Sequence, residues 1–153
     1  IPKFTGFHKY YMFTGDRAFL LAATNFWNIV KQNHTWVIGG NSTGEHFFSK
    51  KEFIDRMLHI SGPETCNSVN MLRLTEALFM QQPDATKAAY YERTLFNHIL
   101  SAYDPVKGMC CYFTSMRPGH IVFMLHVIAL SGAVDIQGWK VRRSWVSLFI
   151  AIK

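Results

Sequence analysis

Charged side chains, cysteines and long apolar runs are all scarce in this sequence, and each scarcity excludes a class of protein. Charged residues make up 17% of the 153 residues and hydrophobic residues 49%, which is not the composition of a disordered chain. The three cysteines, Cys66, Cys110 and Cys111, are an odd number with two adjacent members. We therefore expect reduced thiols or a metal site and no disulfide framework. The apolar run at residues 121–130 is too short to span a bilayer, and His126 interrupts it.

The formal net charge of +6 is the one bulk feature that suggests a nucleic-acid partner. Half of it lies in residues 121–153, which carry a net +3, and the remaining residues form no basic stripe along any predicted helix. Nucleic-acid binding needs basic side chains gathered on one face, so we expect neither nucleic acid nor membrane as a partner. The sequence has no initiator methionine and no charged-then-apolar leader. We therefore read no targeting signal and expect a fragment that lacks its true N-terminus.

Apolar residues recur at helical spacing through residues 1–100. A first helix is expected to end at Thr14-Gly15 and a second to begin at a capping residue, Asp16. Further helices are expected around residues 53–58, after residues 62–63 and from residue 83 onwards. The residues expected to face inward are Phe4, Phe7, Tyr11, Leu20, Ala23, Trp27, Val30, Met71, Leu74, Leu78, Ala88, Tyr91, Leu95 and Ile99. Long helices with short connections predict an all-α fold of antiparallel helical hairpins, as a bundle or a toroid.

Two short segments are expected to be extended. Residues 34–38 are β-prone, and residues 109–114 follow a turn that contains Gly108. Neighbouring side chains of an extended run point to opposite faces. Cys110 and Cys111 are therefore predicted to pack one inward and one outward, and not to share a metal ion.

The loop GGNSTGEHF, residues 39–47, is too rich in glycine and small polar residues for a simple connector. Gly39 and Gly40 would let the backbone approach a ligand closely. Glu45 could donate a proton if its environment favoured the neutral acid. The default interpretation of this loop alone is a surface turn with a solvated glutamate.

The loop GPETCN, residues 62–67, carries a carboxylate and a thiol two residues apart. In an extended stretch residues i and i+2 point to the same side, so Glu64 and Cys66 could converge on one ion, and both are ordinary zinc ligands. Alternatively, Thr65 is a helix N-cap and Cys66 a small buried residue. Two ligands do not complete a zinc site, which needs four, or three and an open position.

The remaining candidate residues are the seven histidines and Glu92. The histidines show neither HxxxH nor HExxH spacing, so a histidine-only metal centre is not supported. Glu92, in the run YYER, could pair with Arg93 or face a cleft, and a solvated helix position is the default for it.

Several strings of the sequence together resemble one known family. IPKFTGFHKYYMFTGDRAFL, GGNSTGEHF, GPETCNSVNMLRL and YFTSMRPGH look like the catalytic domain of glycoside hydrolase family 127, the beta-L-arabinofuranosidase-like proteins. The resemblance runs from residue 1 to about residue 120, and two of its motifs, GGNSxGEHF and GPETCNxxNMLxL, are specific at this separation.

The resemblance implies a fold, a chemistry and a set of site residues. The family's fold is an (α/α)6 barrel, so the chain would be a partial barrel. Its enzymes retain configuration with a zinc-bound cysteine thiolate as nucleophile and a glutamate as general acid/base. Carried over by motif, Glu45 resembles the acid/base, Glu64 and Cys66 two of the zinc ligands, and Tyr112 and Glu92 residues that line the sugar pocket. The implied partner is an arabinose-containing glycan.

The sequence departs from the family after His120. The family's nucleophile and fourth ligand are an adjacent cysteine pair that follows RPGH, whereas Cys110-Cys111 precede it. A shifted reading frame permits tryptophan and two cysteine codons across residues 131–134, at the expected distance from RPGH. We therefore predict that a frameshift near His120 separates a catalytic-domain portion, residues 1–120, from a non-native tail, residues 121–153.

The predicted function is a fragment of a retaining zinc-thiolate hydrolase that removes terminal beta-L-arabinofuranosyl-type sugars, with little or no activity as written. The alternative is a non-catalytic helical module that binds carbohydrate or a protein. A third hypothesis, a small membrane-associated basic protein, is supported only by residues 121–153.

Overall fold

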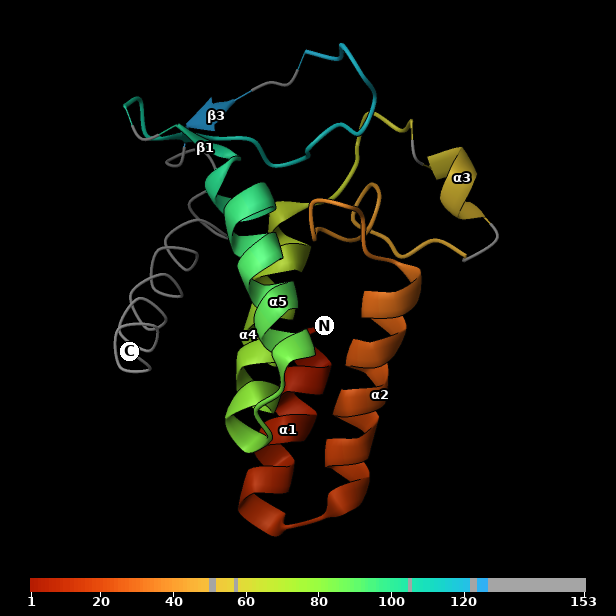
Figure 1. Cartoon of the computed structure of the whole chain (residues 1–153), viewed down its shortest axis with the longest axis vertical. Helices are drawn as coiled ribbons and strands as arrows, with labels where there is room; N and C mark the ends of the chain where they lie inside the picture. Colours follow the sequence, from red (N-terminus) through yellow and green to blue (C-terminus); the bar gives the residue numbers. More distant parts are fainter. Residues whose placement is uncertain (50–51, 57, 105, 122–123, 127–153) are drawn as a thin grey trace.

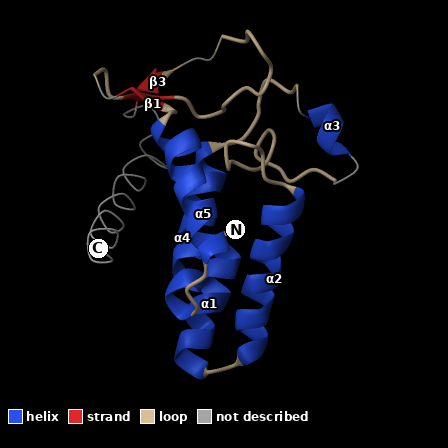
Figure 2. Cartoon of the chain, viewed as in Figure 1, coloured by secondary structure: helices blue, strands red, loops and turns tan. Residues whose placement is uncertain are grey.

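The computed structural model describes residues 1–49, 52–56, 58–104, 106–121 and 124–126 of the chain. Its elements, in chain order, are α1 (Pro2–Thr14), α2 (Arg17–Asn33), α3 (Phe53–Arg56), α4 (Thr65–Gln81), α5 (Ala85–Thr94), the π-helical segment η2 (Leu95–Leu100), β1 (Tyr103–Asp104), β2 (Met109–Cys110) and β3 (Leu125–His126). The hairpin α1–α2 packs against the hairpin α4–α5 (Figure 1). The strands and the longer loops gather at one end of these helices, and the short connection between α1 and α2 lies at the opposite end (Figure 2).

Local signals in the sequence set the helix ends. Gly15 takes the left-handed conformation, with φ of 73°, and ends α1. The Asp16 carboxylate accepts a hydrogen bond from the Ala18 amide at 3.0 Å and so begins α2. Asp84 caps α5 in the same way, through the Lys87 amide at 3.0 Å. The predicted positions of these ends are confirmed.

The main core lies between α2, α4 and α5. Its buried residues are Ala23, Trp27, Val30, Met71, Leu74, Leu78 and Tyr90, with Phe4, Phe7 and Leu20 packed against them. The Trp27 indole donates a hydrogen bond to the Thr75 hydroxyl at 2.8 Å, which satisfies the one polar atom of that ring inside the core. A second cluster, of Leu72, Tyr91 and Leu95, lies on another face of α4. Both clusters contain residues that the periodicity predicted to face inward.

The chain is mostly helical, as predicted, and it also contains a small antiparallel sheet in the order β1-β2-β3. Met109 pairs with Asp104 on one side and with His126 on the other. The expected extended segment is therefore present at residues 109–110.

Two predictions about extended segments are wrong. Residues 34–38 form a single antiparallel β-bridge, Thr35 with Asn41, and no strand, because the Trp36 amide donates to the Gly40 carbonyl at 2.8 Å and closes a tight turn. Cys110 and Cys111 are both buried, at 2% and 4% exposure, and do not point to opposite environments. Strand β2 ends at Cys110, and the chain then bends so that the Cys111 amide donates to the Ala102 carbonyl at 2.7 Å.

Candidate active site

Glu45 sits at the tip of a two-residue turn that the surrounding backbone closes. Thr43 and His46 exchange backbone hydrogen bonds of 2.9 and 3.2 Å. Between them Gly44 and Glu45 have φ values of 55° and 70°, the positive values that type I′ hairpin turns require. A left-handed conformation costs a glutamate about 1–2 kcal/mol. The turn leaves Glu45 exposed, where a ligand from solvent can reach it.

The glycine pair before this turn packs against the protein itself. A Cβ at Gly39 would lie 2.4 Å from Thr94 Oγ1, and one at Gly40 would lie 2.6 Å from His98 Nδ1. The Thr94 hydroxyl also donates to the Gly39 carbonyl at 3.1 Å. The prediction that these glycines admit a ligand is therefore corrected: they let the loop dock on the end of α5 and on η2.

Glu64 is the N-cap residue of α4, so the alternative that placed the N-cap at Thr65 is wrong, and a neighbouring segment fixes the position of Glu64. Its backbone is extended, while Thr65 is already helical, so the predicted extended stretch 64–66 exists only at its first residue. The Thr65 amide donates to the Tyr112 carbonyl at 3.0 Å, and Glu64 forms a β-bridge with Phe113. This pairing brings Tyr112 beside a buried Glu64 that is 6% exposed.

Tyr112 joins the two carboxylates that the sequence singled out. Its hydroxyl lies 2.8 Å from Glu64 Oε1 and 3.2 Å from Glu45 Oε1. Burial, the hydrogen bond to Glu64 and the charges of Glu64, Cys66 and Glu45 all raise the pKa of Tyr112. The phenol therefore keeps its proton over the ordinary pH range.

Cys66 completes this group from the first turn of α4. Burial, the charge of Glu64 and a hydrogen bond with Glu64 raise the pKa of the Cys66 thiol, and the Glu45 charge adds to the effect. The Asn70 amide donates to the Cys66 carbonyl at 3.0 Å and lies 3.8 Å from the sulfur. Cys66 is half-buried, so the alternative in which it is a fully buried packing residue is wrong.

The structure thus brings Glu45, Glu64, Cys66 and Tyr112 together from three separate segments, and we call these four residues the acidic cluster. A hollow of about 330 Å³ is lined by Thr43, Gly44 and His46 of the Glu45 turn and by His59, while none of the four cluster residues lines it. An exposed carboxyl beside a buried carboxylate can transfer a proton to or from a ligand in such a hollow.

Glu92, by contrast, lies outside this cluster. It is exposed on α5 and lines a separate surface hollow with Ala89, Arg93, Phe96 and Asn97. The solvated helix position, which was the default interpretation, fits this placement.

His98 is a buried residue of the site's framework that sequence reasoning did not identify. It is 0% exposed, and its Nδ1 lies 2.9 Å from the Ser68 hydroxyl on α4. Burial lowers the pKa of His98 to about 4, so the imidazole is neutral at pH 7. Tyr90, Thr94 and His98 recur every four residues, and this polar stripe is the signal that could have revealed them.

The residues of the acidic cluster do not by themselves make a complete zinc site. Within the described residues no group of three or more His, Cys, Asp or Glu side chains is arranged to hold a metal ion. Glu64 and Cys66 offer one oxygen and one sulfur in mutual contact, whereas zinc takes at least three protein ligands.

The fold and the site together define a class of protein. It is a mostly helical domain that carries, at its loop end, a thiol and two carboxyl groups in contact with one tyrosine. The family model of the beta-L-arabinofuranosidase GH127 catalytic domain matches residues 1–126. The chain therefore belongs to this glycoside hydrolase family. A search of curated proteins gave no match to the chain.

The match extends to His126, whereas the sequence placed the domain boundary at residue 120, which stays a prediction. Most of the predicted tail, residues 127–153, lies outside the described residues. In the described part of the chain, no helix combines the length and the apolar character needed to cross a bilayer.

Proposed function

We propose that this domain belongs to a retaining hydrolase that removes terminal beta-L-arabinofuranosyl-type sugars from glycans, with Glu45 as general acid/base. The observation that carries the proposal is the bridge from Tyr112 to both Glu45 and Glu64. The family match supports a carbohydrate substrate, and arabinose-containing glycans are the proposed one.

Contacts of the Tyr112 hydroxyl support the role of Glu45 by positioning its side chain. A phenol has one proton, so it can donate to only one carboxylate at a time. The contact of 2.8 Å with buried Glu64 is the shorter of the two, and it takes that proton. The contact of 3.2 Å from the Tyr112 hydroxyl to Glu45 Oε1 is the longer alternative for that proton, and it positions the Glu45 side chain.

An exposed carboxylic acid held in this way can protonate the departing glycosidic oxygen. The resulting carboxylate can then remove a proton from water in the second half of a retaining reaction. Glu64 stays buried and holds Tyr112, and Tyr112 in turn fixes the side chain of Glu45.

Glu64 and Cys66 are proposed as two ligands of a zinc site whose nucleophilic cysteine and fourth ligand would come from the cysteine pair encoded in the restored frame. Bound zinc would supply a low-pKa thiolate for covalent catalysis. The two helical hairpins are proposed as part of an (α/α)6 barrel that further hairpins would close.

For the chain as written we propose little or no hydrolysis, because no adjacent cysteine pair follows RPGH in its sequence. The second candidate function, a non-catalytic carbohydrate-binding module, is favoured by that same feature. Binding alone, however, does not require a carboxyl at the surface beside a buried carboxylate and a thiol.

The test uses a chain whose gene is restored to the predicted frame after residue 120 and a chromogenic aryl beta-L-arabinofuranoside. We expect hydrolysis by the restored chain, background rates for the chain as written, and a loss of roughly 100-fold or more in kcat for Glu45→Gln. Asp55→Asn, an exposed carboxylate on α3, is the control and should keep full activity. Loss of hydrolysis in Glu92→Gln would support the sugar-pocket role that the resemblance implies. Full activity of this variant would support the solvated position that Glu92 has in the structure.

Zinc binding is measured separately on the same chains. A stoichiometric zinc ion that is lost on Cys66→Ser supports the metal proposal. An active restored chain that contains no zinc would overturn the metal proposal, and sugar binding without any hydrolysis would favour the module.

A further inference from the structure

The hollow beside the Glu45 turn is a cavity that the proposed catalytic roles leave unused. Its volume is about 330 Å³, and Thr43, His46, Phe47, Glu52, Arg56 and His59 are among the residues that line it. Small-molecule sites range over about 300–1,000 Å³. The hollow lies at the lower end of that range, which suits one sugar unit and not a longer chain.

Glu45 stands between this hollow and the acidic cluster. Its backbone neighbours Gly44 and His46 line the hollow, while its own carboxylate contacts Tyr112 of the cluster at 3.2 Å. The general acid of a glycosidase contacts the oxygen that links the two sugar units of the substrate, so it lies between them. With the terminal sugar at the acidic cluster, the hollow is therefore the place for the unit on the leaving-group side.

Phe47 gives the hollow an aromatic wall. Its ring packs on Phe26, with centroids 6.1 Å apart, and on His34, with centroids 5.3 Å apart. The residue nevertheless stays 38% exposed. A ring that its neighbours fix and that solvent still reaches offers a platform for the apolar face of a sugar.

Two polar side chains of the lining can complete hydrogen bonds with sugar hydroxyls. The Ser61 amide donates to His59 Nδ1 at 3.1 Å, so the ring hydrogen is on Nε2, which is a donor. Thr43 is 7% exposed, and in the described part of the chain its hydroxyl has no hydrogen-bond partner. A buried hydroxyl without a partner is unfavourable, and a ligand that completes its hydrogen bond removes that penalty.

The opposite charges of Glu52 and Arg56 are paired with each other. Arg56 Nη2 lies 3.4 Å from Glu52 Oε2, so this pair adds no net charge to the hollow. An anionic ligand would meet the Glu52 carboxylate as well as the arginine. A neutral ligand with many hydroxyl groups therefore suits this lining better than an anion does.

We infer that the hollow binds a neutral sugar unit, through Phe47, Thr43 and His59, on the leaving-group side of the bond that Glu45 would protonate. The preferred substrates are then oligosaccharides, because a glycoside with a small leaving group leaves the hollow empty. The leaving-group role rests on the proposed function, whereas sugar binding in the hollow does not.

The test is calorimetric titration of the full chain with arabinofuranobiose, a neutral disaccharide, with free L-arabinose and with inorganic phosphate. The disaccharide is expected to bind at least about tenfold more tightly than arabinose, because it alone fills the cluster and the hollow together. Thr43→Val, which keeps the shape of the side chain, and Phe47→Leu should each remove most of that preference. Because the Thr43 hydroxyl has no partner, Thr43→Val should not weaken folding, so it tests the hollow even if Phe47→Leu does.

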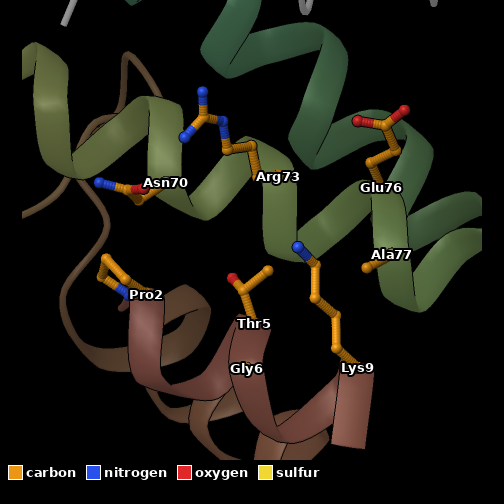
Figure 3. Close-up of a pocket in the computed structure, with 8 residues that line it drawn as sticks. All are labelled: Pro2, Thr5, Gly6, Lys9, Asn70, Arg73, Glu76 and Ala77. Carbon is orange, nitrogen blue, oxygen red and sulfur yellow. The ribbon is translucent and has the colours of Figure 1, made fainter. Parts of the chain in front are cut away.

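The matched controls come from α1. Thr5 lines the groove between α1 and α4 (Figure 3), and Phe13 is 89% exposed. Thr5→Val and Phe13→Leu should leave the preference for the disaccharide unchanged.

Three results would overturn the inference. They are equal binding of disaccharide and arabinose, displacement of the disaccharide by phosphate, and an equal loss in Thr43→Val and Thr5→Val. A restored chain that fails to hydrolyse the aryl arabinofuranoside, with a disaccharide preference that depends on Thr43 and Phe47, would contradict the proposed function alone. Hydrolysis by the restored chain with a preference that ignores both residues would contradict the hollow alone.

Discussion

The helical layer, α1, α2, α4 and α5, and the loop layer, residues 34–64 and 101–121, are held together by different forces. In the helical layer the buried side chains are mostly apolar, as with Ala23, Trp27 and Leu74 at 0–3% exposure. In the loop layer the buried residues include Asn41, Ser42, Thr43 and Glu64, at 0–7% exposure. The first layer depends on area removed from water, and the second on backbone hydrogen bonds and close backbone contacts.

This difference bears on function because the acidic cluster lies in the loop layer and at its junction with α4. Close contacts in the loop layer leave little room for a larger side chain, while an exposed helix face tolerates one. Substitutions matched between the two layers should therefore have unequal effects on stability.

The largest effect is expected for Gly39→Ala, which places a methyl group 2.4 Å from Thr94 Oγ1 at a residue with φ of 92°. Left-handed strain and overpacking together should lower the free energy of unfolding by roughly 3–5 kcal/mol in urea denaturation. Gly44→Ala is the control, since Gly44 also has positive φ, at 55°, with nothing within 4 Å. It should lose only about 1–2 kcal/mol. Equal losses would mean that docking of the loop on α5 contributes nothing.

The next largest effect is the pH dependence that His98 confers. Its pKa is about 4 in the folded protein and about 6.5 in the unfolded chain. Between these values only the unfolded chain binds the proton, so stability is complete above pH 6.5 and falls towards pH 4, by on the order of 3 kcal/mol. Denaturation at several pH values should show this slope.

His98→Gln should flatten most of that slope, while His46→Gln, at an exposed position, should keep it. A residual slope is expected from His8 and His34, since burial lowers the pKa of each. An unchanged slope in His98→Gln would contradict the buried neutral imidazole.

A smaller loss is expected in the helical layer from Thr75→Val. The substitution leaves the buried Trp27 indole without its acceptor at 2.8 Å, which costs about 1–3 kcal/mol. Thr75→Ser keeps the hydroxyl and should recover most of the loss in thermal unfolding. If Thr75→Ser loses as much stability as Thr75→Val, the methyl group contributes as much as the hydroxyl, and the hydrogen bond is not the dominant contribution of Thr75.

The smallest effect has the opposite sign. Gly6 lies within α1, with open space where a Cβ would stand, so Gly6→Ala should raise stability by about 0.5–1 kcal/mol. Circular dichroism during thermal unfolding would detect this as a higher Tm. A loss of stability would mean that α1 is more closely packed there than the structure indicates.

The same contrast explains what the sequence could predict. Helix ends and inward faces followed from Asp16, Gly15 and the apolar spacing, because these signals act within a few residues. The role of Gly39 and Gly40 did not follow, since their contacts are with Thr94 and His98, far along the chain.

The acidic cluster could be predicted only in part, because its contacts also join residues that are far apart along the chain. The resemblance pointed to Glu45, Glu64, Cys66 and Tyr112, and the structure brings all four together, but their catalytic and metal-binding roles stay predictions. The predicted β-character of residues 34–38 is limited to one β-bridge, between Thr35 and Asn41, because Gly39-Gly40 close a turn at once. The frameshift near residue 120 also stays a prediction, which the nucleotide sequence would decide by the presence or absence of two adjacent cysteine codons in the shifted frame.

The most direct measurement follows the rate at which a small alkylating agent modifies Cys66 as pH rises, in metal-free buffer. Cys66 is the half-buried thiol, while Cys110 and Cys111 are buried, so it reports selectively. We predict a thiol pKa above the ordinary value that falls in Glu64→Gln, falls less in Glu45→Gln and stays the same in Glu92→Gln. A thiol pKa that ignores Glu64 and Glu45, or responds equally to Glu92, would mean that these side chains do not share one site.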